Sequence, residues 1–465
     1  MWKSIAGWVS HQVREECQRL QSEGIAAWAA LLPAERVDRI VAEEQGASTA
    51  CSLYTPLVTL WTFLSQVLSF DHSCREAVAQ LLAFTTDNSH SRESVDTSPY
   101  CKARQRLPEQ VCSRLGREVG RELHDRVRDD RLLAGRPAFL VDGTTVSMPD
   151  TPANQAAYPQ ANTQLPGVGF PIARIVALVS LACGAVIDLA IAAYKGKGTG
   201  ETSLFRQLWE TFASGDIVVG DRFFATFWDF SMLTPRGIDG VYRQHQLRIT
   251  KDQRLRRLGP GDWVVRLPKP PRPDWMDEAT YAAIPEYCDV REVTLRIRVR
   301  GFRVECLTVV TTLLDPLLVS AEELARVYRM RWHVELDLRA LKSEMEMDVL
   351  RCKTPEMVRK EIWMHVLGYN LIRTVMADAA ERAGCHPREI SFKGAWQILK
   401  AFRPRLEAAT AASMPGIVST LLAAMGRERV GDRPNRIEPR AIKRRPKPHD
   451  LLTEPRHIAK ARLVQ

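Results

Sequence analysis

Three acidic residues stand where a folded chain could use them to bind metal. Asp142 and Asp221 each follow a short apolar run, at residues 137–141 and 216–220, that predicts a buried strand, and Glu335 lies in a helix-forming segment. A lone aspartate after a strand is more often a turn or capping residue. Three carboxylates on rigid elements, however, supply the hard oxygen ligands that Mg²⁺ prefers. Together they favour phosphodiester chemistry, in which one ion activates the nucleophile and another stabilises the leaving oxygen.

The segment around Glu335 has an unusual distribution of charge. Residues 321–346 lack proline and glycine and predict one continuous helix. At about 100° per residue, one polar face is an ordinary wet surface, and a second polar stripe within about 60° of arc lies between two apolar flanks. The wet face contains Arg326, Arg329, His333, Asp337 and Glu344, and the second stripe contains Tyr328, Arg331, Glu335 and Lys342. Either Glu335 simply pairs with Arg331 one turn back, or the stripe faces protein or a ligand.

The spacing of the second stripe resembles a known signature. Tyr328, Arg331, Glu335 and Lys342 match Tyr-x2-Arg-x3-Glu-x6-Lys, which is found in transposases of bacterial insertion sequences, in the group named after insertion sequence four. The resemblance implies a ribonuclease-H-like core with a mixed central sheet, covering roughly residues 139–373, in which Asp142, Asp221 and Glu335 form the catalytic and metal-binding triad. The 113 residues between Asp221 and Glu335 resemble the insertion typical of this group.

The same resemblance implies a reaction and its partners. We expect cut-and-paste transposition with Mg²⁺, for which Mn²⁺ substitutes: a nick at the element end, a hairpin formed by the released 3′-hydroxyl, reopening of the hairpin, and attack on target DNA. The expected partners are terminal inverted repeats, target DNA and a second copy of the chain in a homodimer. The expected location is the bacterial cytoplasm at the nucleoid.

Five residues are expected to contact DNA. Arg331 can fork two phosphate oxygens, Lys342 supplies a point charge, and Tyr328 donates its hydroxyl. Trp332 borders the stripe and either stacks on a displaced base or belongs to the core. Arg222, beside Asp221, is a further candidate for phosphate contact.

The length of the chain and the order of its apolar and polar segments predict a mixed α/β protein of several parts. Its 465 residues suffice for two or three cores. We expect an N-terminal helical domain at 1–134, which either binds DNA or serves as a scaffold, a catalytic core at 135–244 and 305–400, a β-rich insertion at 245–304, and a helical C-terminal region with a basic, largely extended tail at 401–465.

The charge is concentrated in two segments. The formal net charge is +10, whereas residues 242–272 hold nine bases against two acids and residues 426–465 hold twelve bases against five acids. Such clusters favour phosphate contact. A solvated basic tail is the alternative for the C-terminal segment.

Other classes of protein fit the chain less well. The ten cysteines lack zinc-site spacing and predict reduced thiols, and no signal peptide or membrane segment is expected. Two alternatives to a transposase remain. One is a ribonuclease-H-like endonuclease without strand transfer, and the other is a catalytically silent DNA-binding regulator derived from a transposase.

Overall fold

The computed structural model describes residues 32–45, 53–85, 95–127, 133–245, 247–296, 306–410, 412–431 and 452–463. These fall into two compact units. A helical unit takes its described residues from 1–127, 185–187 and 339–430, and a sheet unit takes them from 128–184, 188–338 and 431–465.

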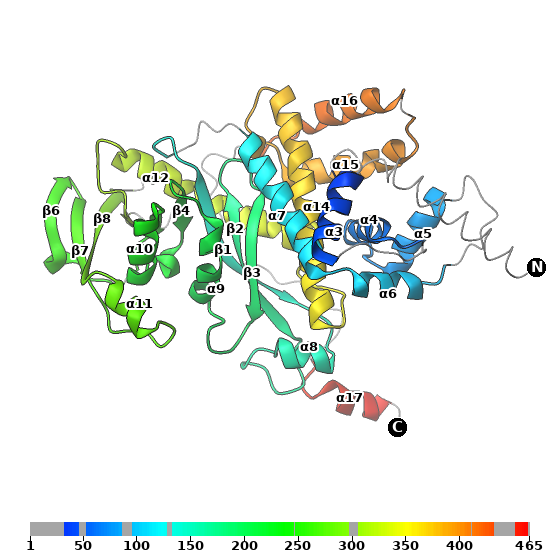
Figure 1. Ribbon diagram of the computed structural model, residues 1–465, viewed down its shortest axis with the longest axis horizontal. Coiled ribbons are helices and arrows are strands. Elements are labelled where there is room, and N and C mark those ends of the chain that lie inside the picture. The colour runs from blue at the N-terminus through cyan, green and yellow to red at the C-terminus, as the bar shows by residue number, and fades with distance from the viewer. Residues whose placement is uncertain are drawn as a thin grey trace, which may run out of the picture. The chain divides into compact units, whose positions relative to one another are not determined.

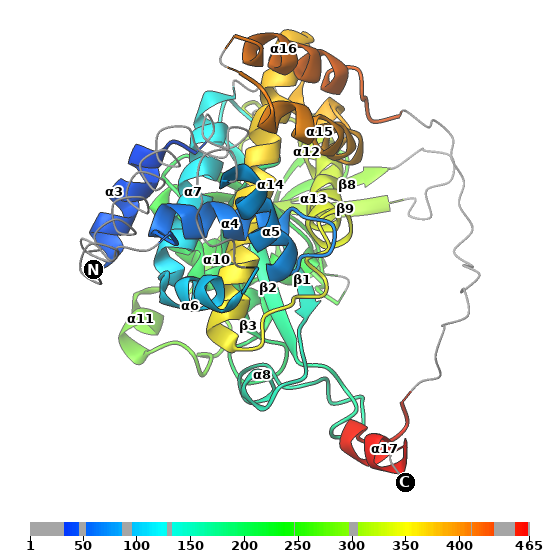
Figure 2. The ribbon, with the colours of Figure 1, turned by 90° about the vertical axis from the view of Figure 1, so that its right-hand side faces the viewer.

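The helical unit is organised around one long buried helix, α14 (Pro355–Arg382), which Figure 2 shows in yellow. It packs against α4, α7, α15 and α16. Asn370 of α14 donates to the carbonyls of Gly116 and Val186, at 2.9 and 2.8 Å, so even its buried amide is paired. The other helices of the unit are α3 (Ala34–Gln45), α4 (Pro56–Val67), α5 (Cys74–Thr85), α6 (Ser98–Arg106), α7 (Glu109–Arg126), α15 (Phe392–Glu407) and α16 (Met414–Met425).

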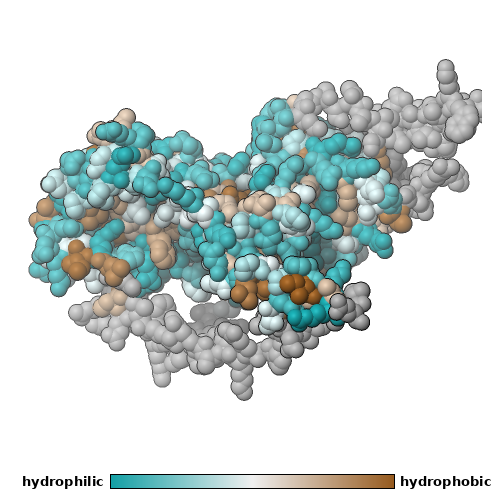
Figure 3. All heavy atoms as spheres, turned by 90° about the horizontal axis from the view of Figure 1, so that it is seen from below, coloured by the Kyte–Doolittle hydropathy of each residue, from teal (hydrophilic) through white to brown (hydrophobic). Residues whose placement is uncertain are grey.

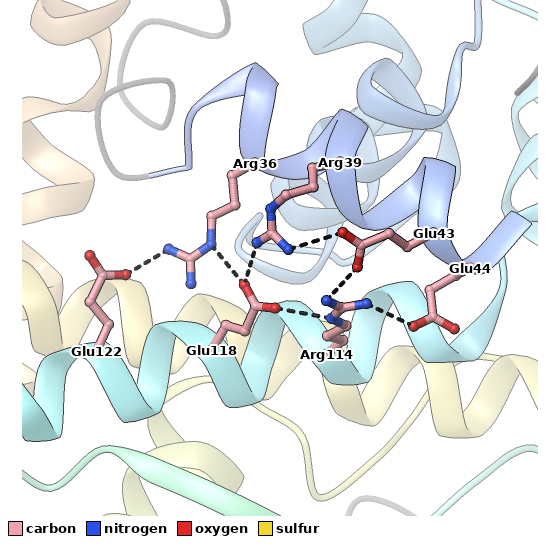
Figure 4. A network of polar contacts seen from close by, with 7 residues as sticks. All are labelled: Arg36, Arg39, Glu43, Glu44, Arg114, Glu118 and Glu122. Carbon is pink, nitrogen blue, oxygen red and sulfur yellow. Dashed lines mark hydrogen bonds and ion pairs between the residues drawn. The ribbon is translucent and has the colours of Figure 1, made fainter. Parts of the chain in front are cut away.

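A network of ion pairs joins α3 to α7 (Figure 4). Arg36 reaches Glu122 at 2.7 Å, and Arg39 reaches Glu118 at 3.0 Å. Arg114 of α7 bonds back to Glu43, Glu44 and Glu118. Arg36, Arg39 and Arg114 are thus matched by acids on the same two helices.

Arg104 of α6 makes its contacts inside the helical unit. Arg104 is only 8% exposed, and its guanidinium donates to Gln66 at 2.9 Å and lies 4.9 Å from the centre of the Phe63 ring. Its charge is therefore used inside the helical unit. Lys102 and Arg106, on the same helix, are exposed.

The sheet unit is built on nine strands in the order β3-β2-β1-β4-β5-β9-β8-β7-β6. β1 runs antiparallel to β2 and parallel to β4, and β4 is parallel to β5. Figure 1 shows β6, β7 and β8 side by side at one end. In chain order the strands are β1 (Ala138–Ser147), β2 (Ile172–Ser180), β3 (Val186–Ala193), β4 (Ile217–Gly220), β5 (Asp239–Arg243), β6 (Arg254–Gly259), β7 (Asp262–Pro268), β8 (Tyr287–Arg296) and β9 (Cys306–Thr311).

This topology confirms the expected fold class. The first five strands form the mixed core sheet of a ribonuclease-H-like fold, and the inserted strands β6–β8 come between β5 and β9 in sequence. The insertion continues the same sheet, because β8 pairs with β9 over residues 291–296. Residues 297–305 lie outside the described residues.

Two long apolar runs of the sequence belong to the cores of the two units. Residues 57–67 lie in α4, where every side chain is buried, and residues 172–194 form β2 and β3. Within the described ranges, no helix combines the length and apolarity needed to cross a bilayer. On the face shown in Figure 3, hydrophobic side chains occur in separate groups among hydrophilic ones.

The basic tail is partly helical. Residues 456–463 form α17 (Arg456–Leu463), so the expected extended conformation is wrong there. Arg456 pairs with Asp150 at 2.8 Å and lies 4.0 Å from the centre of the Phe170 ring, which fixes the start of the helix. Residues 432–451 lie outside the described residues.

A single arginine ties together the starts of three strands. Arg136 precedes β1, and its guanidinium donates to Asp239 of β5 at 2.6 Å and to the carbonyl of Gly215, just before β4, at 2.7 Å. Two further contacts reach the carbonyls of Gly237 and Asp216, at 3.3 and 3.4 Å. These charged, half-buried bonds fix the relative positions of β1, β4 and β5.

We predict that Arg136→Met lowers the free energy of unfolding of the sheet unit by about 2–4 kcal/mol, because it leaves Asp239 and three carbonyls without this donor. Arg136→Lys restores only part of the loss, since an ammonium lacks the planar fork. Urea unfolding measures both. Arg236→Met, which removes an exposed pair with Glu210, is the matched control and costs under about 0.5 kcal/mol. Equal midpoints for Arg136→Met and wild type would contradict the clamp.

Candidate active site

Asp142 lies inside β1, and the register of the sheet brings Asp221 next to it. Parallel pairing runs from Ala138–Ile217 to Leu140–Val219. The same register, carried two residues further, aligns Asp142 with Asp221 on strands about 4.8 Å apart. Both acids therefore occupy the same edge of the core sheet.

The predicted end of the first strand is wrong. β1 does not stop at Asp142, because its antiparallel pairing with β2 continues to Ser147 opposite Ile172. Gly143 consequently pairs with Val176 in an extended strand. Only the parallel neighbour, β4, ends at this level.

Asp221 is held by its own backbone. It caps the short 3-10 helix Arg222–Phe224, and its Oδ1 accepts a hydrogen bond from the amide of Phe223 at 2.7 Å. Gly220 before it is tightly enclosed, since a Cβ there would lie 2.8 Å from the Val141 side chain. These contacts fix the direction in which the chain leaves β4.

The helix that carries Glu335 is not continuous. α12 (Ala321–Met330) begins with a capping box between Ser320 and Glu323, and α13 (Trp332–Arg339) passes into a π-helical turn at Ala340–Glu344. At the break, the amides of Arg331 and Val334 bond to carbonyls only three residues back, at 3.1 Å each. The helix is therefore tightened at Arg331 and widened after Arg339.

These breaks alter the predicted faces. The flank formed by Val334, Leu338, Leu341 and Met345 is buried as expected. Asp337, expected on the wet face, is only 1% exposed, and Leu336 is 40% exposed. A wheel drawn at a constant angle fails here because the helix does not keep a constant pitch.

Arg331 lies between two of the acids. Its Nη2 donates to Glu335 Oε1 at 2.6 Å, and its Nη1 is 3.9 Å from Asp142 Oδ2. The pairing within the helix thus exists, and the same guanidinium also approaches the sheet. Glu335 thus pairs with Arg331 one turn back, and the same Arg331 side chain also faces Asp142 of the sheet.

The electrostatics connect all three acids. Burial raises the pKa of Asp142 to about 6, while the amide of Gly143 and the charge of Arg331 lower it. The negative charges of Asp221 and Glu335 raise it further. Asp221 and Glu335 therefore both lie within electrostatic reach of Asp142, and Arg331 offsets part of their repulsion of it.

The oxygens of these acids suit a divalent cation. One oxygen of each accepts a hydrogen bond, from Gly143 N at 2.8 Å, Phe223 N at 2.7 Å and Arg331 at 2.6 Å respectively. The second oxygens accept no hydrogen bond within the described chain. Among the described residues, no three acid, histidine or cysteine side chains already converge as a complete ligand set. The three acids fit Mg²⁺, because this ion prefers carboxylate oxygens as ligands. The Arg331 guanidinium already lies near two of them, where their negative charge attracts a cation.

The expected DNA-contact residues occupy different environments. Tyr328 is buried, and burial raises its pKa, while Arg331 and Arg243 lower it. Trp332 is 57% exposed, so it is not a core residue. Arg222 is half-buried directly after Asp221, and Lys342 lies in the π-helical turn, which belongs to the helical unit.

Sequence analysis missed Arg243 as a site residue. It ends β5, and continuing the register of β4 with β5 from Gly220–Tyr242 aligns Arg243 with Asp221. Its charge also reaches Tyr328. The available signal was its position directly after a buried run, the same position that singled out Asp221.

Comparisons with known proteins agree with this geometry. Residues 133–371 match the family model described as "Transposase DDE domain". The chain is 26% identical over 426 residues to the transposase InsG for insertion sequence element IS4 of Escherichia coli strain K12, covering 89% of this chain and 91% of that one.

Two further similarities are more limited. The putative transposase InsL for insertion sequence element IS186A of E. coli strain K12 is 40% identical over 62 residues, which is 13% of this chain and 17% of that one. A solved piggyBac transposase synaptic complex with hairpin DNA aligns with a TM-score of 0.40 at 10% identity, over 85% of this chain and 84% of that one.

We predict that Arg331→Met destabilises the metal-free sheet unit by about 1–3 kcal/mol at neutral pH, because it leaves Asp142 and Glu335 without their shared cation. The cost shrinks when Glu335→Gln is also present, since fewer charges then need compensation. Urea unfolding in EDTA measures the four-member cycle. Arg326→Met on α12 is the control. Equal costs of Arg331→Met in both backgrounds would exclude the coupling.

Proposed function

The chain belongs to the transposase DDE domain family, and we propose that it catalyses cut-and-paste transposition of an insertion sequence with Asp142, Asp221 and Glu335 as its metal-binding triad. The observation that supports this most strongly is the placement of Asp142 beside Asp221 by strand register, together with the Arg331 guanidinium between Asp142 and Glu335. Separate strands and a helix thereby contribute to one acidic site.

The proposed chemistry follows from the donor set. Divalent ions held by the three carboxylates would activate the attacking water or 3′-hydroxyl and stabilise the leaving oxygen. The protein's own part is positional: β1 and the cap after β4 fix two acids, and α13 brings in the third. Mg²⁺ is the proposed ion, with Mn²⁺ as a substitute.

The proposed DNA path uses the cations around this site. Arg331 is placed to exchange its carboxylate partners for phosphate oxygens when metal neutralises the acids. Arg222 and Arg243 flank Asp221, and we propose that they contact the same backbone. Tyr328 and Lys342 are proposed as further phosphate contacts, as the signature implies.

The sequence of strand events is also part of the proposal. A first nick releases a 3′-hydroxyl, which attacks the opposite strand to form a hairpin, and after reopening it attacks target DNA. The hairpin step comes from the resemblance of the Tyr328–Lys342 signature. Terminal inverted repeats and target DNA are the proposed substrates, and a homodimer holding two ends is the proposed assembly at the bacterial nucleoid.

We predict that the chain nicks and joins linear DNA carrying its element ends in Mg²⁺ or Mn²⁺, and that EDTA abolishes both products. Asp142→Ala, Asp221→Ala and Glu335→Ala each lower the rate at least about 10³-fold, because each removes a metal ligand. Gel electrophoresis of end-labelled DNA measures each step.

Asp252→Asn, at an exposed acid of the same unit, is the control and leaves the rate unchanged. Triad variants that cleave as fast as wild type would rule out this mechanism. Nicking without any joined product would favour an endonuclease, and DNA binding without nicking would favour a silent regulator.

Trp332 provides a separate test of the hairpin step. Its exposure suits an aromatic platform for a base displaced near the transposon end, worth about 1–3 kcal/mol. We predict that Trp332→Ala slows hairpin formation by about 10–100-fold and slows first-strand nicking much less, whereas Trp332→Phe keeps most of both rates. Single-turnover assays on pre-nicked and intact DNA separate the steps. Equal loss of both would contradict stacking.

A further inference from the structure

Two cysteine thiols lie in contact within the helical unit. Cys74 is the first residue of α5, and Cys101 lies in α6. Their sulfur atoms are 3.8 Å apart, with the Cys101 thiol donating to the Cys74 sulfur, and both free cysteines are half-buried. A disulfide bond is about 2 Å long, so a small movement of the two sulfurs converts this contact into a covalent bond.

The Arg104 guanidinium is held against this pair of thiols. Its Nη2 lies 3.3 Å from the Cys74 sulfur and 4.0 Å from the Cys101 sulfur. Its Nη1 donates to Gln66 at 2.9 Å, and the centre of the Tyr100 ring lies 5.0 Å from its Cζ. These contacts fix the direction of the guanidinium, so that one of its nitrogens faces the two sulfurs.

Packing alone does not explain the charge of Arg104. The side chain is only 8% exposed, and among the described residues no carboxylate forms an ion pair with it. A buried cation without an anion is costly. Deprotonation of Cys74 supplies such an anion, and the position of Cys74 at the start of α5 also favours a negative charge.

These surroundings favour oxidation of the pair over the binding of a metal ion. Burial raises the pKa of the Cys74 thiol, while the charge of Arg104 lowers it. The guanidinium stabilises a thiolate, which is the nucleophile in thiol oxidation, whereas it repels a metal cation. A second thiol already in contact allows a sulfenic acid on Cys74 to condense to a disulfide.

We propose that Cys74 and Cys101 form a reversible oxidation site for small peroxides. The Cys74 thiolate attacks one peroxide oxygen, the O–O bond breaks, and the other oxygen takes up a proton and leaves as water or an alcohol. Cys74 is thereby oxidised to a sulfenic acid, and the peroxide is reduced. The Cys101 sulfur then attacks the Cys74 sulfur, its proton passes to the departing hydroxide, and water leaves as the disulfide forms.

The disulfide changes the helical unit in two ways. It joins the start of α5 to α6 across 27 positions of the sequence. It also removes the anion that Cys74 can offer to Arg104, because a disulfide carries no charge. Neither effect depends on the proposed metal site, which involves other residues.

The test follows the thiols of the full-length chain. The reduced chain is freed of reductant, treated with equimolar hydrogen peroxide, alkylated and digested for mass spectrometry. We expect a peptide pair in which Cys74 is linked to Cys101 with the loss of two hydrogens, and we expect dithiothreitol to reverse the link. Cys101→Ser leaves the sulfenic acid on Cys74 uncondensed, so dimedone labels Cys74 in this variant and not in wild type.

Arg104 is tested by the rate of the first step. We expect Arg104→Met to slow the oxidation of Cys74 about 10-fold at neutral pH, because fewer thiolates form, and Arg104→Lys to keep more of the rate. Circular dichroism shows whether both variants fold. If Arg104→Met does not fold, Arg104→Lys and Cys101→Ser decide the outcome.

Other cysteines of the chain supply the controls. Cys385→Ser removes a half-buried thiol of the same unit and leaves the link between Cys74 and Cys101 unchanged. Oxidation of the exposed Cys306 while Cys74 and Cys101 stay reduced would overturn the site. A link from Cys74 to any other cysteine, or equal dimedone labelling of Cys74 in wild type and Cys101→Ser, would overturn the role of Cys101.

Discussion

The alignment of β1 with β4 is the constraint on which the site depends. Parallel strands that share a register bring residues at equivalent positions together, and here that register aligns Asp142 with Asp221 although 78 residues separate them in sequence. A slip of one residue would turn one of the two side chains to the opposite face of the sheet. Arg136 bonds to the segments that begin β4 and β5, and so opposes such a slip.

A second constraint is the mutual repulsion of acids in a partly buried place. In the absence of metal, Arg331 reduces this repulsion, because its guanidinium lies between Asp142 and Glu335. Arg331 itself stands at the break in the helix, between the end of α12 and the start of α13. Under the proposed function, the same guanidinium would contribute to stability without metal and to DNA binding.

Much of this could be predicted from sequence. Apolar runs predicted β4 and the buried part of β1, because a short continuous apolar run is the usual sequence signal of a buried strand. The length of β1 beyond Asp142 could not be predicted, since it depends on pairing with β2, which is distant in sequence. The break at Arg331 is likewise invisible to a constant helical period.

The two ends of the core strands have different tasks. Arg136 secures β1, β4 and β5 where they begin, whereas Asp142, Asp221 and Arg243 lie where the parallel pairing finishes. The contacts that stabilise the sheet therefore lie at one end of the parallel strands, and the proposed metal-binding residues lie at the other end. Sequence change at the starting edge is tolerated whenever another donor maintains the clamp, while the finishing edge is restricted by charge. Engineering for robustness can consequently proceed at the first edge without altering the composition of the second.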